Sequence, residues 1–160
     1  MVKAPNSQQL YLIAHNIRSL HNVGAIFRTA DSFGVHKIYL TGYTGAPLGK
    51  NADKISKVAL GAEQFVPWEK VKNLGPLLKK LKASGVRITV LENNVKYKTT
   101  PLPKFKAKFP IALVLGEETK GNTKKILDLA DDILEIPMHG QKESLNVSVA
   151  CGVALYQIAK

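Results

Sequence analysis

The chain has 160 residues, 45% of them hydrophobic, which suits one domain over residues 1–160 with a single core. One cysteine excludes an internal disulfide, and no apolar run approaches the roughly 20 residues of a membrane span, so we expect a cytoplasmic protein. The 23 Lys and Arg outnumber the 12 Asp and Glu and give a net charge of +11, with +13 before Glu117 and −2 from there on, which suits a polyanionic partner that binds the first two thirds of the chain.

Short β-branched runs alternate with helical patterns along the chain. We predict strands at residues 10–17, 37–41, 64–67, 86–91, 111–115 and 133–136. We predict helices at residues 22–33, 53–60, 69–83, 122–130 and 144–159, with a basic linker over 93–109. This alternation predicts an α/β fold with a mostly parallel sheet, helices on both faces and a ligand site at the carboxyl ends of the strands.

Asn22, Gly24 and Arg28 follow the first predicted strand, in the first predicted helix. Gly24 leaves room for a ligand, and Arg28 lies off the apolar stripe of the helix, where its planar guanidinium could hold a phosphate. The alternative is a surface ion pair between Arg28 and Asp31, which stand three positions apart. From the residues alone, the ion pair is the simpler interpretation.

Leu115 and Gly116 end a buried strand and lead through two adjacent glutamates to Gly121. Backbone amides in such a loop could hold a carboxylate or hydroxyl of a ligand. Neighbouring carboxylates in a turn usually point apart into solvent or cap the next helix, so acid–base catalysis by Glu117 or Glu118 is not favoured.

A third junction runs from Ile136 through Met138 to Ser144, where a strand becomes a loop and a helix begins. A functional role for Ser144 competes with a simpler one, the N-cap of that helix. His139 lies in the same loop without a catalytic partner, and the four histidines show no zinc spacing with Cys151. We therefore expect neither a metal site nor a catalytic triad.

The linker over residues 94–109 alternates lysines with aromatic side chains. This pattern could combine phosphate contacts with stacking on unpaired bases, or the aromatic rings could pack inward and leave the lysines in solvent. The aromatic residues are Tyr97, Phe105 and Phe109, and the lysines are Lys96, Lys98, Lys104, Lys106 and Lys108.

Taken together, the three junctions resemble the three sequence motifs of the SpoU/TrmH family of RNA methyltransferases, in the SPOUT superfamily. The matching residues are 22–31, 115–121 and 136–150, and residues 55–63 also resemble the family. Two positions depart from its pattern: Asn122 stands where leucine is common, and His21 stands where asparagine often precedes the first motif. The resemblance covers nearly the whole chain as one domain, with no appended RNA-binding domain.

The resemblance implies a SPOUT fold in which the C-terminal segment forms a deep trefoil knot, a feature that no periodicity could reveal. It implies a homodimer that transfers a methyl group from S-adenosyl-L-methionine to a ribose 2′-hydroxyl of tRNA or rRNA. The implied cofactor contacts come from Leu115, Gly116, Ile136, Met138, Ser144 and Leu145.

The resemblance also implies roles for individual side chains. Arg28 of one subunit would meet the cofactor pocket of the other, and Arg28 is the family's proposed base. Because a guanidinium stays protonated at neutral pH, we expect Arg28 instead to hold the adjacent phosphate and stabilise oxyanion charge. Asn22 and Asn146 would fix the ribose and the loop, Ser144 would orient the cofactor or Asn146, and Glu118 would secure the second loop. The expected RNA contacts are Arg18, Arg28, Lys50, Lys54, Lys96, Lys98, Lys104 and Lys106.

Two other functions compete with this one. An RNA-binding or assembly module could keep the methyltransferase fold without transfer, and the presence of Arg28, Glu118, Ser144 and Asn146 argues against it. A nucleotide-dependent Rossmann enzyme is not favoured, because the first strand-to-helix turn lacks G-x-G-x-x-G and the sequence contains no P-loop.

Overall fold

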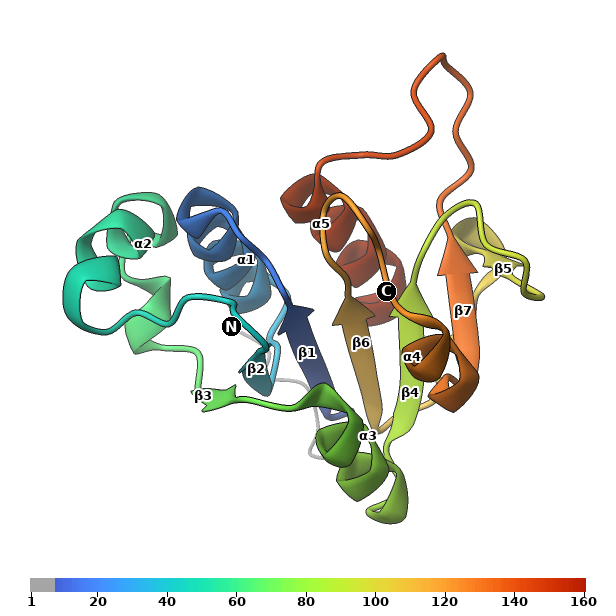
Figure 1. Cartoon of the computed structure of the whole chain (residues 1–160), viewed down its shortest axis with the longest axis horizontal. Helices are drawn as coiled ribbons and strands as arrows, with labels where there is room; N and C mark the ends of the chain where they lie inside the picture. The colour runs from blue at the N-terminus through green and yellow to red at the C-terminus, as the bar shows by residue number, and fades with distance from the viewer. Residues whose placement is uncertain (1–7) are drawn as a thin grey trace.

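Seven parallel strands form one sheet in the order β3-β2-β1-β6-β4-β7-β5 (Figure 1). The structure is a computed structural model and describes residues 8–160. The strands are β1 (Leu10–His15), β2 (Lys37–Thr41), β3 (Trp68–Val71), β4 (Arg87–Leu91), β5 (Thr100–Pro101), β6 (Ile111–Leu115) and β7 (Asp132–Glu135). The helices are α1 (Leu20–Ser32), α2 (Ala52–Ala59), α3 (Leu74–Ala83), α4 (Lys124–Leu129) and α5 (Val147–Ala159), with short 3₁₀ helices η1 (Gly49–Asn51), η2 (Ala62–Gln64) and η3 (Leu102–Lys104).

Helices cover both faces of the sheet, as the alternation predicted. α1, α2 and α5 pack on one face and α3 and α4 on the other, so β6 is buried along its whole length. Cys151 lies in the first of these layers, where burial raises the pKa of its thiol to about 12. Over residues 8–160, no helix is long and apolar enough to cross a membrane. The α/β fold with a parallel sheet is confirmed, and the trefoil knot stays a prediction.

One predicted strand lies in the wrong place. Residues 64–67 contain the end of η2 rather than a strand, and β3 begins only at Trp68. The helix predicted from residue 69 begins instead at Leu74. Pro76 supplies the reason, because proline is tolerated in the first turn of a helix but would break a helix that began at residue 69. The segment before it is free to form an edge strand, with Trp68 and Val71 half-buried.

The last helix, α5, begins at Val147 rather than at residue 144. Asn146 is its N-cap, and its Oδ1 accepts a hydrogen bond from the Ser148 N–H at 2.9 Å. The N-cap interpretation of Ser144 is therefore wrong, and Ser144 lies exposed in the loop before the helix. Asparagine and serine cap helices about equally well, so propensity alone could not choose between the two positions.

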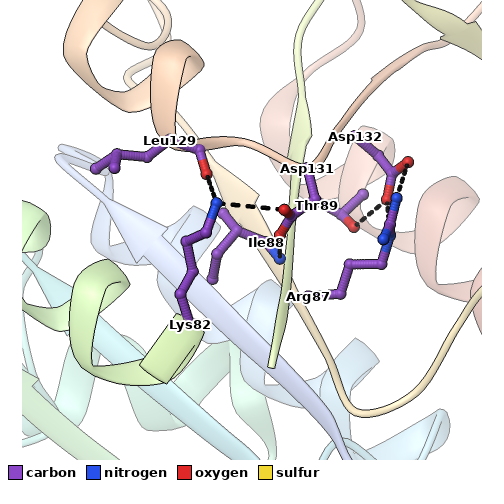
Figure 2. A network of polar contacts seen from close by, with 7 residues as sticks. All are labelled: Lys82, Arg87, Ile88, Thr89, Leu129, Asp131 and Asp132. Atoms are coloured by element: carbon purple, nitrogen blue, oxygen red, sulfur yellow. Dashed lines mark hydrogen bonds and ion pairs between the residues drawn. The ribbon is translucent and has the colours of Figure 1, made fainter. Parts of the chain in front are cut away.

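A polar network ties the start of β7 to β4 (Figure 2). Arg87 donates from Nε and Nη2 to the two oxygens of Asp132, at 2.6 and 3.1 Å. The Asp131 carboxylate accepts from the Ile88 N–H at 2.8 Å and from Lys82 at 3.2 Å. Paired and hydrogen-bonded in this way, the two carboxylates fix the register of β7 and the starting point of the loop after it.

Candidate functional site

A cavity of about 540 Å³ lies at the carboxyl ends of β4, β6 and β7, the edge of the sheet where a ligand site was predicted. Its volume is within the roughly 300–1,000 Å³ of small-molecule sites. Residues of all three predicted motifs line it, together with the segment after β4. The loop between β7 and α5, which carries the third motif, rises above this edge of the sheet (Figure 1).

Carboxylates dominate the charge of the cavity, although the chain as a whole carries +11. The charged lining residues are Glu92, Glu117, Glu118, Glu143 and Lys120. Such a lining attracts a cation and repels the phosphates of a nucleotide, which argues further against a Rossmann enzyme. The apolar wall consists of Leu91, Leu115, Ile136, Leu145, Val147 and Ala150. The part of the chain that the structure describes contains no group of three or more His, Cys, Asp or Glu placed to hold a metal ion.

Side chains from the three motifs meet in one hydrogen-bonded series at the cavity. Asn22, near the start of α1, donates from Nδ2 to Glu118 Oε1 at 2.6 Å. Asn146, the N-cap of α5, donates from Nδ2 to Asn22 Oδ1 at 3.4 Å. Asn22 is buried, whereas Glu118 and Asn146 are exposed at the rim. Glu118 therefore joins the first motif to the second, and Asn22 joins both to the third.

The loop after β6 is held by Glu92, a residue that sequence reasoning missed. Glu92 Oε2 accepts from the Asn122 N–H at 2.7 Å and from Asn122 Nδ2 at 3.1 Å, and we call this pair the Glu92 clamp. Asn122, which departs from the family pattern, is buried against Gly116. A Cβ on Gly116 would lie 2.5 Å from the Asn122 amide, so packing requires glycine there.

Asn93 holds the third motif in a similar way. Its Nδ2 donates to the Ile136 carbonyl oxygen at 2.9 Å and to that of Glu143 at 3.3 Å, and its Oδ1 accepts from the Ile136 N–H at 3.0 Å. Glu92 and Asn93 belong to no motif, which is why they were missed. Their position was the available signal, because both follow a strand in the middle of a parallel sheet, where ligand sites form.

The predicted site residues do not all reach the cavity. Arg28 is exposed on α1 and does not line the cavity of its own chain, and Met138 is absent from the lining too. Within residues 8–160, Arg28 forms no ion pair with Asp31, so the surface-pair interpretation is not supported. A Cβ on Gly24 would lie 2.6 Å from the Ile55 carbonyl oxygen, so this glycine serves the packing of α1 on α2 rather than a ligand. The predicted cofactor contacts that line the cavity are Leu115, Gly116, Ile136, Ser144 and Leu145.

The expected RNA-binding side chains are all exposed and form two separate groups. The first group lies on α1, α2 and the loops beside them and consists of Arg18, Arg28, Lys50 and Lys54. The second group lies on the linker around β5, the last strand in the sheet order, and consists of Lys96, Lys98, Lys104 and Lys106. For Phe105 and Phe109 the structure supports the alternative in which the aromatic rings of the linker pack inward. Phe105 is buried, Phe109 packs against the core, and Tyr97 packs beside α4 and donates to Asp128 at 2.7 Å.

Gly121 and Gly34 offer a matched test of the Glu92 clamp. Both have a positive φ, 65° and 66°, so alanine at either position costs about 1–2 kcal/mol of backbone strain. A Cβ at Gly121 would also lie 2.6 Å from Glu92 Oε2, whereas nothing lies within 4 Å of a Cβ at Gly34. We expect Gly121→Ala to lower the free energy of unfolding, measured by urea denaturation, by clearly more than Gly34→Ala. Equal losses would show that Glu92 does not hold the loop.

The sequence model of the SpoU rRNA Methylase family matches residues 9–156. The chain is 34% identical over 159 residues to the 23S rRNA (guanosine-2′-O-)-methyltransferase RlmB of Vibrio cholerae. That alignment covers 99% of this chain and 62% of the relative, so the chain spans less than two thirds of the relative's length.

Two solved structures share the fold at similar coverage of this chain. The TrmH/SpoU tRNA modifying enzyme of A. aeolicus has a TM-score of 0.81 and 33% identity, over 94% of this chain and 75% of that one. An AdoMet-bound rRNA methyltransferase from Sinorhizobium meliloti has a TM-score of 0.84 and 25% identity, and the match covers 96% of this chain and 56% of that one. Since the family model spans the three motifs and all seven strands of the sheet, the chain belongs to the SpoU rRNA methylase family.

Proposed function

We propose that the chain transfers a methyl group from S-adenosyl-L-methionine to a ribose 2′-hydroxyl of tRNA or rRNA. The observation that carries the proposal is the cavity where the three motifs meet through Asn22, Glu118 and Asn146. The names of two relatives support the chemistry: RlmB of V. cholerae is a guanosine-2′-O-methyltransferase of 23S rRNA, and the S. meliloti enzyme was solved with AdoMet. The net charge of +11 supports an RNA substrate.

The residues around the cavity fit this cofactor. Leu115, Ile136 and Leu145 supply an apolar wall suited to an adenine ring, and Ser144 lies beside them. The glutamates of the lining favour the positive charges of a sulfonium and an ammonium group. Bound there, S-adenosyl-L-methionine supplies a methyl group activated by a positively charged sulfur. We also propose that the C-terminal segment forms the trefoil knot that the family resemblance implies.

The part that this chain's own residues play is to position the ribose and to stabilise charge. Asn22 and Asn146 present amide groups at the cavity that would hydrogen-bond the ribose, and Glu118 fixes the orientation of the Asn22 amide. The 2′-oxygen would form its bond to the methyl carbon as the carbon–sulfur bond breaks and leaves the neutral thioether, and the hydroxyl proton would pass to water; correct positioning lowers the barrier to that step. Arg28, always charged, would hold the neighbouring phosphate and stabilise the developing oxyanion.

Because Arg28 does not line the cavity of its own chain, it would act on the cavity of a second subunit. α5 carries an exposed apolar strip of Val149, Val153 and Tyr156, with exposed fractions of 51%, 41% and 66%. These residues are four and three positions apart and therefore share one side of the helix. A homodimer through this strip would cover apolar surface on α5, which packs against the helix that carries Arg28. RNA and a second copy of the chain are the proposed partners, in the cytoplasm.

Titration calorimetry followed by a transfer assay tests the proposed function. The protein is expected to bind S-adenosyl-L-methionine and its demethylated product, and to transfer labelled methyl groups to bulk tRNA or rRNA from cells that lack it. A methyl group on a 2′-oxygen blocks alkaline hydrolysis of the adjacent phosphodiester, so label in alkali-resistant dinucleotides would identify the ribose as the acceptor. Binding without transfer would favour the RNA-binding module, and no binding of cofactor or product would refute the proposal.

A further inference from the structure

The turn after β2 presents an aromatic side chain, Tyr43, that is 51% exposed. β2 pairs with β1, and β1 pairs with β6, all in parallel. The turn therefore lies at the same edge of the sheet as the loops around the cavity, two strands away from the loop after β6. Neither the three motifs nor the proposed reaction assigns this side chain a role.

Hydrogen bonds hold the backbone on both sides of the Tyr43 ring. The Tyr43 N–H donates to Asn16 Oδ1 at 3.1 Å, and Lys70 donates to the carbonyl oxygens of Gly42 and Thr44. Thr44 is buried, and its hydroxyl bonds to the backbone of β1 and of the segment after it. Gly42 has a φ of 62°, and a Cβ there would collide with the Asn16 side chain, so only glycine fits. Because the backbone of this turn is already fixed, binding of a ligand to the ring would cost little loop entropy.

Arg18 and Glu117 are the charged neighbours of this ring. The pKa of Tyr43 is raised, first by desolvation and then by the Glu117 carboxylate, and Arg18 partly opposes the shift. Glu117 lines the cavity, as does Ser19, which follows Arg18 and caps α1. Tyr43, tied through its N–H to Asn16, therefore lies near Arg18 and the segment that leads into the cavity. One nucleotide could reach both, with its base on the ring and its phosphate on the arginine.

The loop that begins with this turn continues into a basic surface. Gly45 packs against Leu20, where a Cβ would lie 2.5 Å from the leucine side chain, so the loop lies against the start of α1. Beyond it, Lys50, Lys54 and Lys57 are exposed on η1 and α2. This surface complements a polyanion. Phe105 and Phe109 of the linker pack inward and Tyr97 bonds to Asp128, whereas the Tyr43 ring is exposed in the loop that leads to these basic residues.

We propose that Tyr43 and Arg18 form a platform for one unpaired nucleotide next to the methylated ribose, with the ring stacked on the base and the guanidinium on the phosphate. The inference rests on the proposed methyl transfer and adds that the RNA is single-stranded at this nucleotide. A duplex offers no free base face to the ring. Tyr43 is then a positioning residue that sets RNA affinity and takes no part in the bond changes.

Fluorescence anisotropy with a labelled oligoadenylate of about twelve nucleotides, alone or annealed to oligouridylate, tests the platform in the full chain. Wild type is expected to bind the single strand more tightly than the duplex. Tyr43→Ala is expected to weaken single-strand binding about tenfold and to remove that preference, and Tyr43→Phe, which keeps the ring, to stay within about twofold of wild type. Phe65→Ala removes another exposed ring, just after η2, and is expected to bind like wild type.

Calorimetric titration of S-adenosyl-L-methionine, expected to be equal in all four proteins, separates this inference from the proposed function. With bulk RNA, Tyr43→Ala is expected to raise KM more than it lowers kcat. If Tyr43→Ala binds the single strand as tightly as wild type, or if wild type does not bind it, the platform is refuted. If the ring is required for single-strand binding but no methyl transfer is detected, the platform stands and the proposed function fails.

Discussion

Arg28→Lys is expected to lower the rate of methyl transfer by about 10²–10³, the usual cost of losing one preorganised contact to developing charge. Lysine keeps the positive charge but loses the planar fork that can hold a phosphate and a 2′-oxygen together. Arg28 is exposed on α1 and does not line the cavity of its own chain. The free energy of unfolding and the affinity for S-adenosyl-L-methionine should therefore remain those of wild type.

Single-turnover assays with enzyme in excess over labelled RNA measure this effect without a contribution from product release. Arg18→Lys is the matched control, since it changes another exposed arginine and is expected to weaken RNA binding with a much smaller loss of rate. If Arg28→Lys keeps more than about a tenth of the wild-type rate, well short of the expected cost, Arg28 is structural and the proposed mechanism is wrong.

Mixing two impaired variants tests whether Arg28 acts across a subunit interface. In a dimer of Arg28→Lys with Asn146→Asp, the first chain keeps an intact cavity and the second keeps an intact Arg28. Random exchange in an equal mixture is expected to restore about a quarter of the active sites, because half of the dimers are mixed and each has one complete site. The two variants are unfolded and refolded together so that their subunits exchange. If the mixture then recovers no methyl-transfer activity, Arg28 and the cavity that it serves belong to one chain.

Asn146→Asp is expected to lower the rate of methyl transfer by about 10–100-fold while the thermal midpoint stays unchanged or rises. Aspartate caps a helix as well as asparagine and favours the helix dipole, so the bond from the Ser148 N–H survives. The lost group is the Nδ2 donor to Asn22 Oδ1. The Asn22 amide could then satisfy Glu118 or the new carboxylate but not both, so the orientation in which it meets the ribose would no longer be fixed.

Asn146→Ala separates the two roles of this residue. It removes both the cap and the donor, so it is expected to lose about 1 kcal/mol of stability in addition to the loss of rate. Differential scanning calorimetry and the single-turnover assay together give both quantities. An Asn146→Asp protein as fast as wild type would mean that the contact to Asn22 does not position the ribose, and that Asn146 serves only to begin α5.

Local patterns were sufficient for the α/β fold and for the place of the site. The strand over residues 111–115 was predicted with its observed bounds, because an uninterrupted apolar run buried on both faces has few alternatives. The loops after it and after the last strand carry the second and third motifs, and both line the cavity. Patterns failed at residues 64–73 and 144–146, where short segments of mixed polarity fit a strand, a helix turn or a loop equally well.

Most strands and helices, and the loops that carry the motifs, could thus be predicted from local patterns, because they depend on residues close together in the chain. The contacts of Glu92 with Asn122 and of Asn93 with Ile136 span 30 and 43 residues of sequence, and they are visible in the folded chain alone. Those partners depend on the strand order, which brings β4 between β6 and β7 and which no local periodicity encodes. The exposure of Tyr43 was decided in the same way, because it depends on how a distant lysine and asparagine fix its turn.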